Sequence, residues 1–133
     1  MKIYLAGRYG RLEQFRELRS NLHELGHIVT SRWLDTNWSR NVDSGSSAAP
    51  EEHREKFALI DIQDVLSADC VINFTEEPDS TNGKRGGRHV EFGIALQAGK
   101  RLIVVGFREN LFHHHPSVEF FTDVQELLKV LGE

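Results

Sequence analysis

Short apolar runs alternate with stretches of helical periodicity along the chain. Runs rich in aliphatic, β-branched or aromatic side chains predict strands at residues 3–6, 27–33, 70–74 and 102–105, with a short fifth strand at residues 118–121. Between them, apolar residues recur every three or four positions and predict helices at residues 12–25, about 51–67 and about 88–98. A last helix is expected to begin at Thr122, where Gln125 would complete a capping box.

The apolar side of each predicted helix should face the sheet. The helix at residues 51–67 is expected to pack through Ala58, Leu59, Ile62, Val65 and Leu66. Glycines at positions 26 and 99 are expected to end the first and third helices. Residues 34–50 and 75–87 are polar and predict loops, and a loop as long as the first is often a lid or a binding segment.

The alternation of strands and helices indicates crossover connections between parallel strands. We therefore expect an α/β protein, a three-layer Rossmann-like (flavodoxin-like) sandwich with a parallel sheet of four to five strands. The 133 residues contain no repeat and no linker, so residues 1–133 are expected to form a single domain. Ligands bind such sheets beyond the carboxyl ends of the strands, which here means the loops at residues 7–10, 33–50, 75–87 and 106–116.

Composition narrows the functional classes. The sequence is 39% hydrophobic and 27% charged, with a net charge of −4, which is ordinary for a soluble protein and disfavours binding to a nucleic acid polymer. The one cysteine, Cys70, lies in an apolar run and is expected to be a buried thiol, which suits a reducing compartment. The sequence shows no membrane span, secretory signal or lipidation motif, so a cytoplasmic protein is expected.

Glu91 is the first candidate for chemistry. It lies in the segment Gly-Gly-Arg-His-Val-Glu-Phe-Gly at residues 86–93, in the expected first turn of a helix that follows a strand and a glycine-bearing loop. The positive end of a helix dipole favours an ionised carboxylate, and such a group can attack an anomeric carbon. On position alone, a glutamate that only complements the helix dipole is the favoured interpretation.

Asp61 and a basic loop are further candidates. Asp61 lies on or beside the apolar side of its helix, where a charged group is rare without a partner. It would either reach into the site or pair with an arginine at the helix boundary. Lys84, Arg85 and Arg88 surround a glycine pair, and backbone amides, a helix start and cations together form an anion site. A solvated basic loop has the same pattern.

Other chemistries are disfavoured by missing motifs. The sequence contains no P-loop, no Gly-x-Gly-x-x-Gly after the first strand and no Gly-x-Ser-x-Gly elbow. The histidines at positions 113–115 are consecutive and therefore point in different directions, so no metal site is expected. Trp33 and Trp38 flank the first long loop, and either could stack on a base or pack in the core.

Four segments occur in an order that is informative as a set. The first two are Lys-Ile-Tyr-Leu-Ala-Gly at residues 2–7 and residues 25–29. The third is Asp61 placed eight residues before Asp69, and the fourth is Gly-Arg-His-Val-Glu-Phe-Gly-Ile-Ala-Leu at residues 87–96 with Gly99-Lys100 shortly after it. In this order and spacing they resemble the nucleoside 2-deoxyribosyltransferase family and its relatives, the deoxynucleotide N-glycosidases, over most of the chain.

The resemblance implies a role for each matching residue. Glu91 would be the nucleophile, Tyr4 would orient it by a hydrogen bond, and Asp61 would contact the sugar and the leaving base. The expected substrate-binding residues are Gly7, Arg8, Tyr9, Trp33, Arg85, Gly86, Gly87, Arg88 and Asn110. Neighbouring subunits in the family often complete each other's site, which implies a homodimer or larger homo-oligomer, with residues 108–110 as the group donated across the interface.

One position departs from the family pattern. Many of the transferases carry an aspartate six residues before the nucleophile, where this chain has Arg85. The departure favours a nucleoside 5′-monophosphate over a free nucleoside and leaves hydrolase and transferase both open. The implied reaction passes through a glycosyl-glutamate intermediate and needs no metal or cofactor. A non-catalytic nucleotide-binding sensor is the alternative, because a fold does not fix a function.

Overall fold

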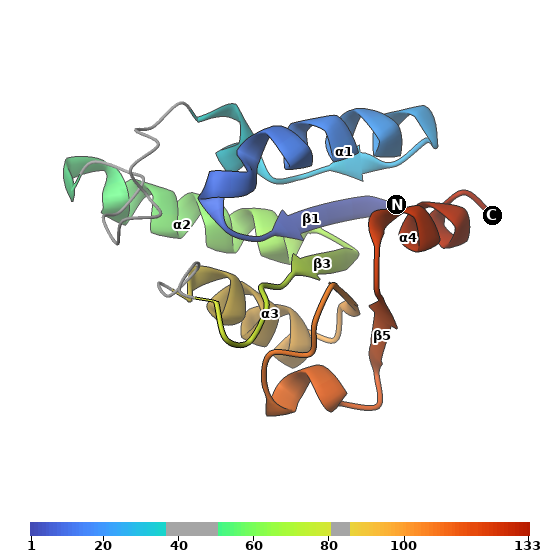
Figure 1. Cartoon of the computed structure of the whole chain (residues 1–133). Helices are drawn as coiled ribbons and strands as arrows, with labels where there is room; N and C mark the ends of the chain where they lie inside the picture. Colours follow the sequence, from blue (N-terminus) through green and yellow to red (C-terminus); the bar gives the residue numbers. More distant parts are fainter. Residues whose placement is uncertain (37–50, 81–85) are drawn as a thin grey trace.

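The chain is built on a parallel sheet, shown in a computed structural model that describes residues 1–36, 51–80 and 86–133 (Figure 1). The strand order is β2-β1-β3-β4-β5, and all neighbouring strands are parallel. The strands are Lys2–Ala6 (β1), Ile28–Val29 (β2), Cys70–Phe74 (β3), Arg101–Val105 (β4) and Val118–Phe121 (β5). This order is the flavodoxin-like one, so the predicted fold class is confirmed.

Within the described residues, four α-helices cover the two faces of the sheet. Helices α1 (Leu12–Glu24) and α4 (Val124–Leu131) pack on one face, and α2 (Glu51–Ser67) and α3 (Gly87–Gln97) pack on the other. Short 3-10 helices follow three of the strands: Tyr9–Arg11 (η1), Arg32–Asp35 (η2) and Leu111–His114 (η4). No helix in the described parts of the chain is long and apolar enough to cross a membrane.

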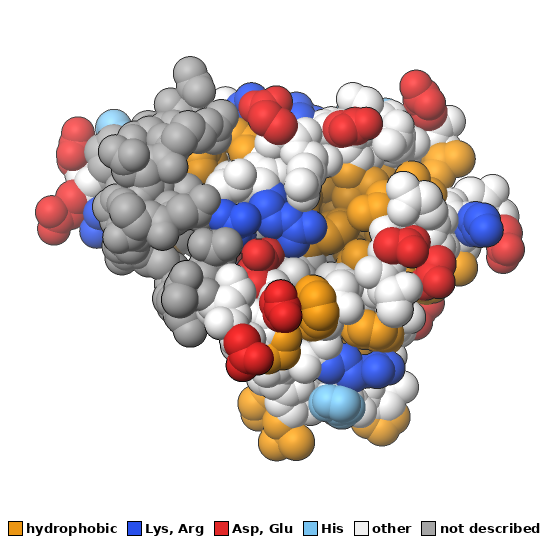
Figure 2. Space-filling view, in the orientation of Figure 1, with side chains coloured by type: hydrophobic (Ala, Val, Ile, Leu, Met, Phe, Trp, Pro, Cys, Tyr) orange, Lys and Arg blue, Asp and Glu red, His pale blue; other side chains and the backbone are white. Residues whose placement is uncertain are grey.

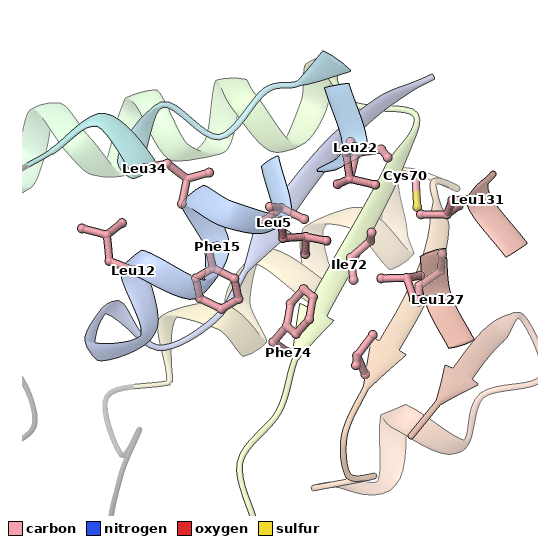
Figure 3. Close-up of a cluster of buried hydrophobic side chains, with 14 residues drawn as sticks. Leu5, Leu12, Phe15, Leu22, Leu34, Cys70, Ile72, Phe74, Leu127 and Leu131 are labelled. Atoms are coloured by element: carbon pink, nitrogen blue, oxygen red, sulfur yellow. The ribbon is translucent and has the colours of Figure 1, made fainter. Parts of the chain in front are cut away.

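The central strands are buried on both faces, so alternate residues enter different cores. In β1, Leu5 faces α1 and α4, whereas Tyr4 faces α2 and α3. Figure 3 shows the first of these cores, where side chains of α1, of the central strands and of α4 meet. The rings of Phe15 and Phe74 lie 5.0 Å apart there in an edge-on arrangement. This alternation places the tyrosine on the face covered by α2 and α3.

The second strand is shorter than predicted. The sequence predicted residues 27–33, but β2 ends at Val29 and a 3-10 turn follows. The side chain of Ser31 explains the early end, because its Oγ accepts a hydrogen bond from the Leu5 amide at 2.7 Å, where a longer strand would continue the ladder. Residues 37–50 of the predicted loop, with Trp38, lie outside the described residues.

Helix α2 has the predicted bounds but packs through a different side. Val65 and Asp64 are buried, whereas Leu59, Ile62 and Leu66 are 59%, 41% and 49% exposed. The prediction that these three face the core is therefore wrong. The helix is rotated because Asp64 faces η2 and accepts hydrogen bonds from the backbone amide and Nε of Arg32 at 3.0 and 2.9 Å.

The helix ends mostly follow the predicted signals. Gly26 and Gly99 have φ angles of 89° and 72°, as expected of glycines that end helices. The start of α4 differs from the prediction, since the capping residue is Asp123, whose side chain accepts from the Glu126 amide at 2.9 Å. Glu126 in turn accepts from the Thr122 amide, so the box exists one residue later than predicted.

Candidate active site

Tyr4 and Glu91 meet between the sheet and α3. Tyr4 is completely buried in β1, and its hydroxyl donates a hydrogen bond to Oε2 of Glu91. Glu91 is partly buried on the side of α3 that also carries the buried residues Phe92 and Ala95. The two residues come from segments 87 positions apart, so the contact depends on the whole crossover from β1 to α3.

Asp61 adds a second carboxyl group near this pair. It lies on α2, and its Oδ1 is buried without a hydrogen-bond partner among the described residues. Burial and the charge of Asp64 raise the pKa of Asp61 to about 6, although Arg32 opposes the shift. Burial and the charges of Glu91 and Asp61 also raise the pKa of Tyr4 above its ordinary value. The three acidic groups therefore act on one another electrostatically.

The ionisation of Glu91 differs from what its sequence position suggested. Burial raises the pKa of Glu91 to about 8, the Tyr4 hydrogen bond lowers it and the charge of Asp61 raises it again. Because α3 begins at Gly87, Glu91 is its fifth residue and lies beyond the first turn. The effect of a helix dipole is largely confined to that turn. Burial, rather than the dipole, therefore controls this carboxyl group.

Aromatic residues stand at the end of β1. Gly7 follows the strand, and a Cβ atom there would lie only 2.3 Å from Cζ of Phe15, so the position requires a glycine. The indole Nε1 of Trp33 donates to the Leu5 carbonyl at 2.8 Å, which fixes the ring against β1. Tyr9 lies beside Trp33 with 6.2 Å between ring centroids. These three predicted residues are together at one strand end.

Charged residues link the loops at the carboxyl ends of β1 and β3. Nε of Arg8 lies 3.4 Å from Oε1 of Glu76, and Nη1 of Arg11 lies 2.9 Å from Oε2 of the same residue. Figure 2 shows basic and acidic side chains side by side near the middle of the face that it draws. A cavity of about 610 Å³ opens beside them toward β4 and the start of α4, and Arg11 and Glu76 are part of its lining.

Glu109 joins the loop after β4 to the start of α3. Its carboxylate accepts hydrogen bonds from Nη2 of Arg88 at 2.9 and 3.0 Å, from the amide of Glu76, and is 2.9 Å from Nε2 of His89. Burial opposes ionisation of Glu109, but the Glu76 amide and the Arg88 guanidinium outweigh it and lower its pKa. Arg88, predicted to bind substrate, is thus 7% exposed and held by a carboxylate.

The remaining predicted residues are divided between the helix start and the loop after β4. Gly86 precedes α3 with a φ angle of 79°, a left-handed conformation that favours glycine, and Gly87 is the first residue of the helix. Oδ1 of Asn110 accepts from the Phe112 amide at 2.9 Å and caps η4 within its own chain. Arg85 and Lys84 lie outside the described residues.

The described residues contain no group of three histidine, cysteine or acidic side chains placed to hold a metal ion. Of the three consecutive histidines, His113 is buried, and its Nδ1 accepts from the Glu109 amide at 3.0 Å. Burial lowers the pKa of His113 to about 4, and the charge of His89 lowers it too. His113 is therefore a neutral packing residue near pH 7.

Three solved structures share the fold of this protein over almost the whole chain. A 2-deoxyribosyltransferase of Bacillus psychrosaccharolyticus is 20% identical, with a TM-score of 0.68 over 98% of this chain and 96% of its own. CMP N-glycosidase of Clostridium botulinum is 19% identical, with a TM-score of 0.63 over 98% of both chains. The chain has the 2-deoxyribosyltransferase fold. A conserved protein of Enterococcus faecalis V583 shares it at 15% identity, with a TM-score of 0.64 over 98% of this chain and 96% of its own.

The 2-deoxyribosyltransferase fold confirms the family resemblance at the level of structure. No protein-family model and no curated protein matches the sequence. The order of the four segments at residues 2–7, 25–29, 61–69 and 87–100 was the sequence signal for the family resemblance, whereas the alternation of strands and helices predicted the fold class.

The partner of Glu109 and the position of Asn73 were missed in the sequence. Residues 108–110 were expected to be donated across a subunit interface, and only the three-dimensional contact reveals that the Glu109 carboxylate binds Arg88 of its own chain. Asn73 is a polar residue inside the apolar run 70–74, and it is completely buried in β3. A polar side chain in a strand buried on both faces was a usable signal for Asn73.

Proposed function

We propose that this chain cleaves or transfers the N-glycosidic bond of a nucleoside or of its 5′-monophosphate, with Glu91 as the nucleophile. The observation that carries the proposal is the hydrogen bond from the buried Tyr4 hydroxyl to Glu91, with Asp61 within electrostatic reach. Two solved structures with this fold are a 2-deoxyribosyltransferase and a CMP N-glycosidase, which supports the same bond as the target.

The proposed reaction has two displacement steps. An oxygen of the Glu91 carboxylate forms a bond to C1′ while the bond from C1′ to the base nitrogen breaks, and the base leaves with the electron pair and takes up a proton. Water then attacks C1′ of the glycosyl ester, gives up a proton and releases the carboxylate. A second base can replace water, which makes the reaction a transfer. Two inversions retain the configuration at C1′.

Each neighbour of Glu91 has a distinct task in this scheme. The Tyr4 hydrogen bond holds the carboxylate in place and stabilises its ionised form. Asp61 has a buried oxygen available to a sugar hydroxyl or to the leaving base. Trp33 and Tyr9 offer ring surface beside the end of β1. Gly86 and Gly87, at the start of α3, line the end that receives the 5′ group in this scheme.

The free protein must lose a proton from Glu91 before this chemistry starts. With a pKa of about 8, the carboxyl group is mostly protonated at pH 7. A catalytic pKa near the working pH is ordinary for enzymes. Turnover should therefore increase as the pH rises toward the pKa of Glu91.

The test is a panel of nucleosides and 5′-monophosphates, with and without an acceptor base, followed by chromatography of the free base. We expect base release from at least one substrate, lost by about 10³-fold or more in Glu91→Gln. Glu17→Gln removes an exposed carboxyl from α1 and is the matched control. Equal base release by Glu91→Gln and the wild type would exclude Glu91 as nucleophile. Tight binding with no base release would indicate the sensor instead.

We also propose that the protein acts as a homodimer or larger homo-oligomer. The exposed apolar side of α2, made of Leu59, Ile62 and Leu66, supports an association through this helix. These residues follow helical spacing and lie on one side of α2, away from the sheet.

A further inference from the structure

Asn73 is a buried amide without a hydrogen-bond partner in the part of the chain that the structure describes. It is the fourth residue of β3 and is 0% exposed, yet neither Nδ2 nor Oδ1 has a hydrogen-bond partner among the described residues. Nearly all buried polar groups in proteins are paired, because an unpaired group loses its hydrogen bonds to water on folding and gains none in the protein. The position therefore costs stability and calls for a functional reason.

The strand register places Asn73 on the same side of the sheet as Tyr4. In β3, Asn73 lies between Ala6 of β1 and Val104 of β4, both of which belong to the core under α2 and α3. Tyr4 pairs with Val71, two residues earlier on the same face. Asn73 is thus one step closer than Tyr4 to the carboxyl edge of the sheet, where ligands enter folds of this class.

Two other buried polar side chains, which lie just beyond strand ends, are paired locally. Oγ of Ser31 accepts from the Leu5 amide at 2.7 Å, and Oγ1 of Thr75 donates to the Val105 carbonyl at 3.2 Å. Asp61, by contrast, has an unpaired buried oxygen and belongs to the site around Glu91. The face that carries Glu91 therefore includes Asn73 and Asp61, each with a buried polar atom that no described residue bonds.

We propose that Asn73 binds a hydroxyl group of the substrate sugar, an inference that rests on the proposed function. An amide side chain offers a donor and an acceptor together, and a hydroxyl group can use both. A phosphate would use only the donor. Since Glu91 must reach C1′, the 2′- and 3′-hydroxyl groups on the same ring are the substrate groups that fit beside it on this face. Asn73 is then a specificity residue for the sugar.

The first test separates this role from a structural one. Asn73→Leu keeps the branched shape and removes the unpaired polar atoms, so its melting temperature should equal or exceed that of the wild type. Ser31→Ala is the matched control, because it removes a paired buried polar group and should lower the melting temperature. A loss of stability in Asn73→Leu equal to that in Ser31→Ala, repeated in the smaller Asn73→Ala, would mean that the fold itself uses the amide and would overturn the proposal.

The second test compares sugars. Base release is measured with ribonucleoside 5′-monophosphates and with their 2′-deoxy and 3′-deoxy forms. We expect Asn73→Leu to reduce kcat/KM by about 10- to 100-fold for substrates that carry the bound hydroxyl, and to leave the form that lacks it nearly unchanged. The deoxy form that loses this sensitivity identifies the hydroxyl. An equal effect on every sugar, or no effect, would refute the proposal.

A binding measurement keeps this inference apart from the proposed catalysis. Titration calorimetry with the same nucleotides is done on Glu91→Gln with and without Asn73→Leu. If the wild type releases no base but binding of a nucleotide depends on Asn73, catalysis fails and the sugar contact stands. If the wild type is active and Asn73→Leu neither binds nor reacts differently, the sugar contact fails and catalysis stands. Absence of any nucleotide binding would overturn both.

Discussion

Replacing Glu91 with glutamine should stabilise the fold, and the gain should grow with pH. The pKa of Glu91 rises from an ordinary value of 4.5 to about 8 in the folded chain, chiefly because the group is buried. At pH values below the pKa of the carboxyl group in the unfolded chain, the raised pKa has no effect on the free energy of unfolding. Stability is then lost as the pH increases from 4.5 toward 8, because the unfolded chain ionises first. Glutamine is neutral throughout and can still accept the Tyr4 hydrogen bond.

The size of the effect follows from the pKa difference. Ionising a carboxyl group with this shift costs the folded state up to about 5 kcal/mol above the higher pKa. For a chain of this length, such a gain in Glu91→Gln corresponds to an increase of up to about 15 °C in melting temperature. At about pH 4 the wild type and the variant should melt within about 2 °C of each other.

The assay is thermal melting of both proteins at about pH 4, 7 and 9, with urea unfolding at the highest pH to obtain the free energy. Glu17→Gln, which removes an exposed carboxyl group, controls for the change in net charge and should show no gain that grows with pH. If Glu91→Gln shifts the melting temperature equally at every pH, or destabilises the protein at about pH 9, the carboxyl group is not buried in the way described.

Further consequences can be measured in the same protein. The kcat/KM for base release should increase with pH and level off above about 8, because only the ionised form of Glu91 attacks; a pH-independent profile would contradict this. Glu109→Ala should lower the free energy of unfolding by about 3 kcal/mol or more, since it removes the carboxylate that pairs with the buried Arg88 guanidinium. Glu119→Ala breaks a half-exposed pair and should cost below about 1 kcal/mol in the same urea titration. Ile62→Lys, in the exposed apolar side of α2, should convert the oligomer to monomers in light scattering, and an unchanged mass would place the interface elsewhere.

The layers of the fold were predictable because the strands are short, apolar and well separated. Cys70–Phe74 and Val118–Phe121 have the bounds that the apolar runs predicted, and α2 begins and ends where expected. The side on which α2 packs was not predictable. Its leucine and isoleucine residues follow one helical stripe, and periodicity does not say whether a stripe faces the sheet or another surface. The salt bridge between Asp64 and Arg32 fixes which side of α2 faces the sheet. The spacing of apolar residues does not predict this salt bridge.

The site was predictable where the family pattern supplies the residue. Tyr4 and Glu91 do meet, which local sequence alone could not show. The charge state of Glu91 was misjudged, because the helix start was expected one residue later and because burial cannot be read from a single position. The basic side chain of Arg88 was interpreted as an anion ligand, whereas its partner Glu109 lies 21 residues further along the chain.

The contacts of the Glu109 carboxylate should limit the changes in length that the loop after β4 tolerates. It accepts bonds from the start of α3 and from the backbone that follows β3, while its own amide is bonded to His113. An insertion or deletion anywhere between Gly106 and His113 would move this carboxylate and disturb its hydrogen bonds to both segments. Surface loops usually accept changes in length, but this one should resist them, because its length sets the position of a carboxylate that holds two segments of the candidate site.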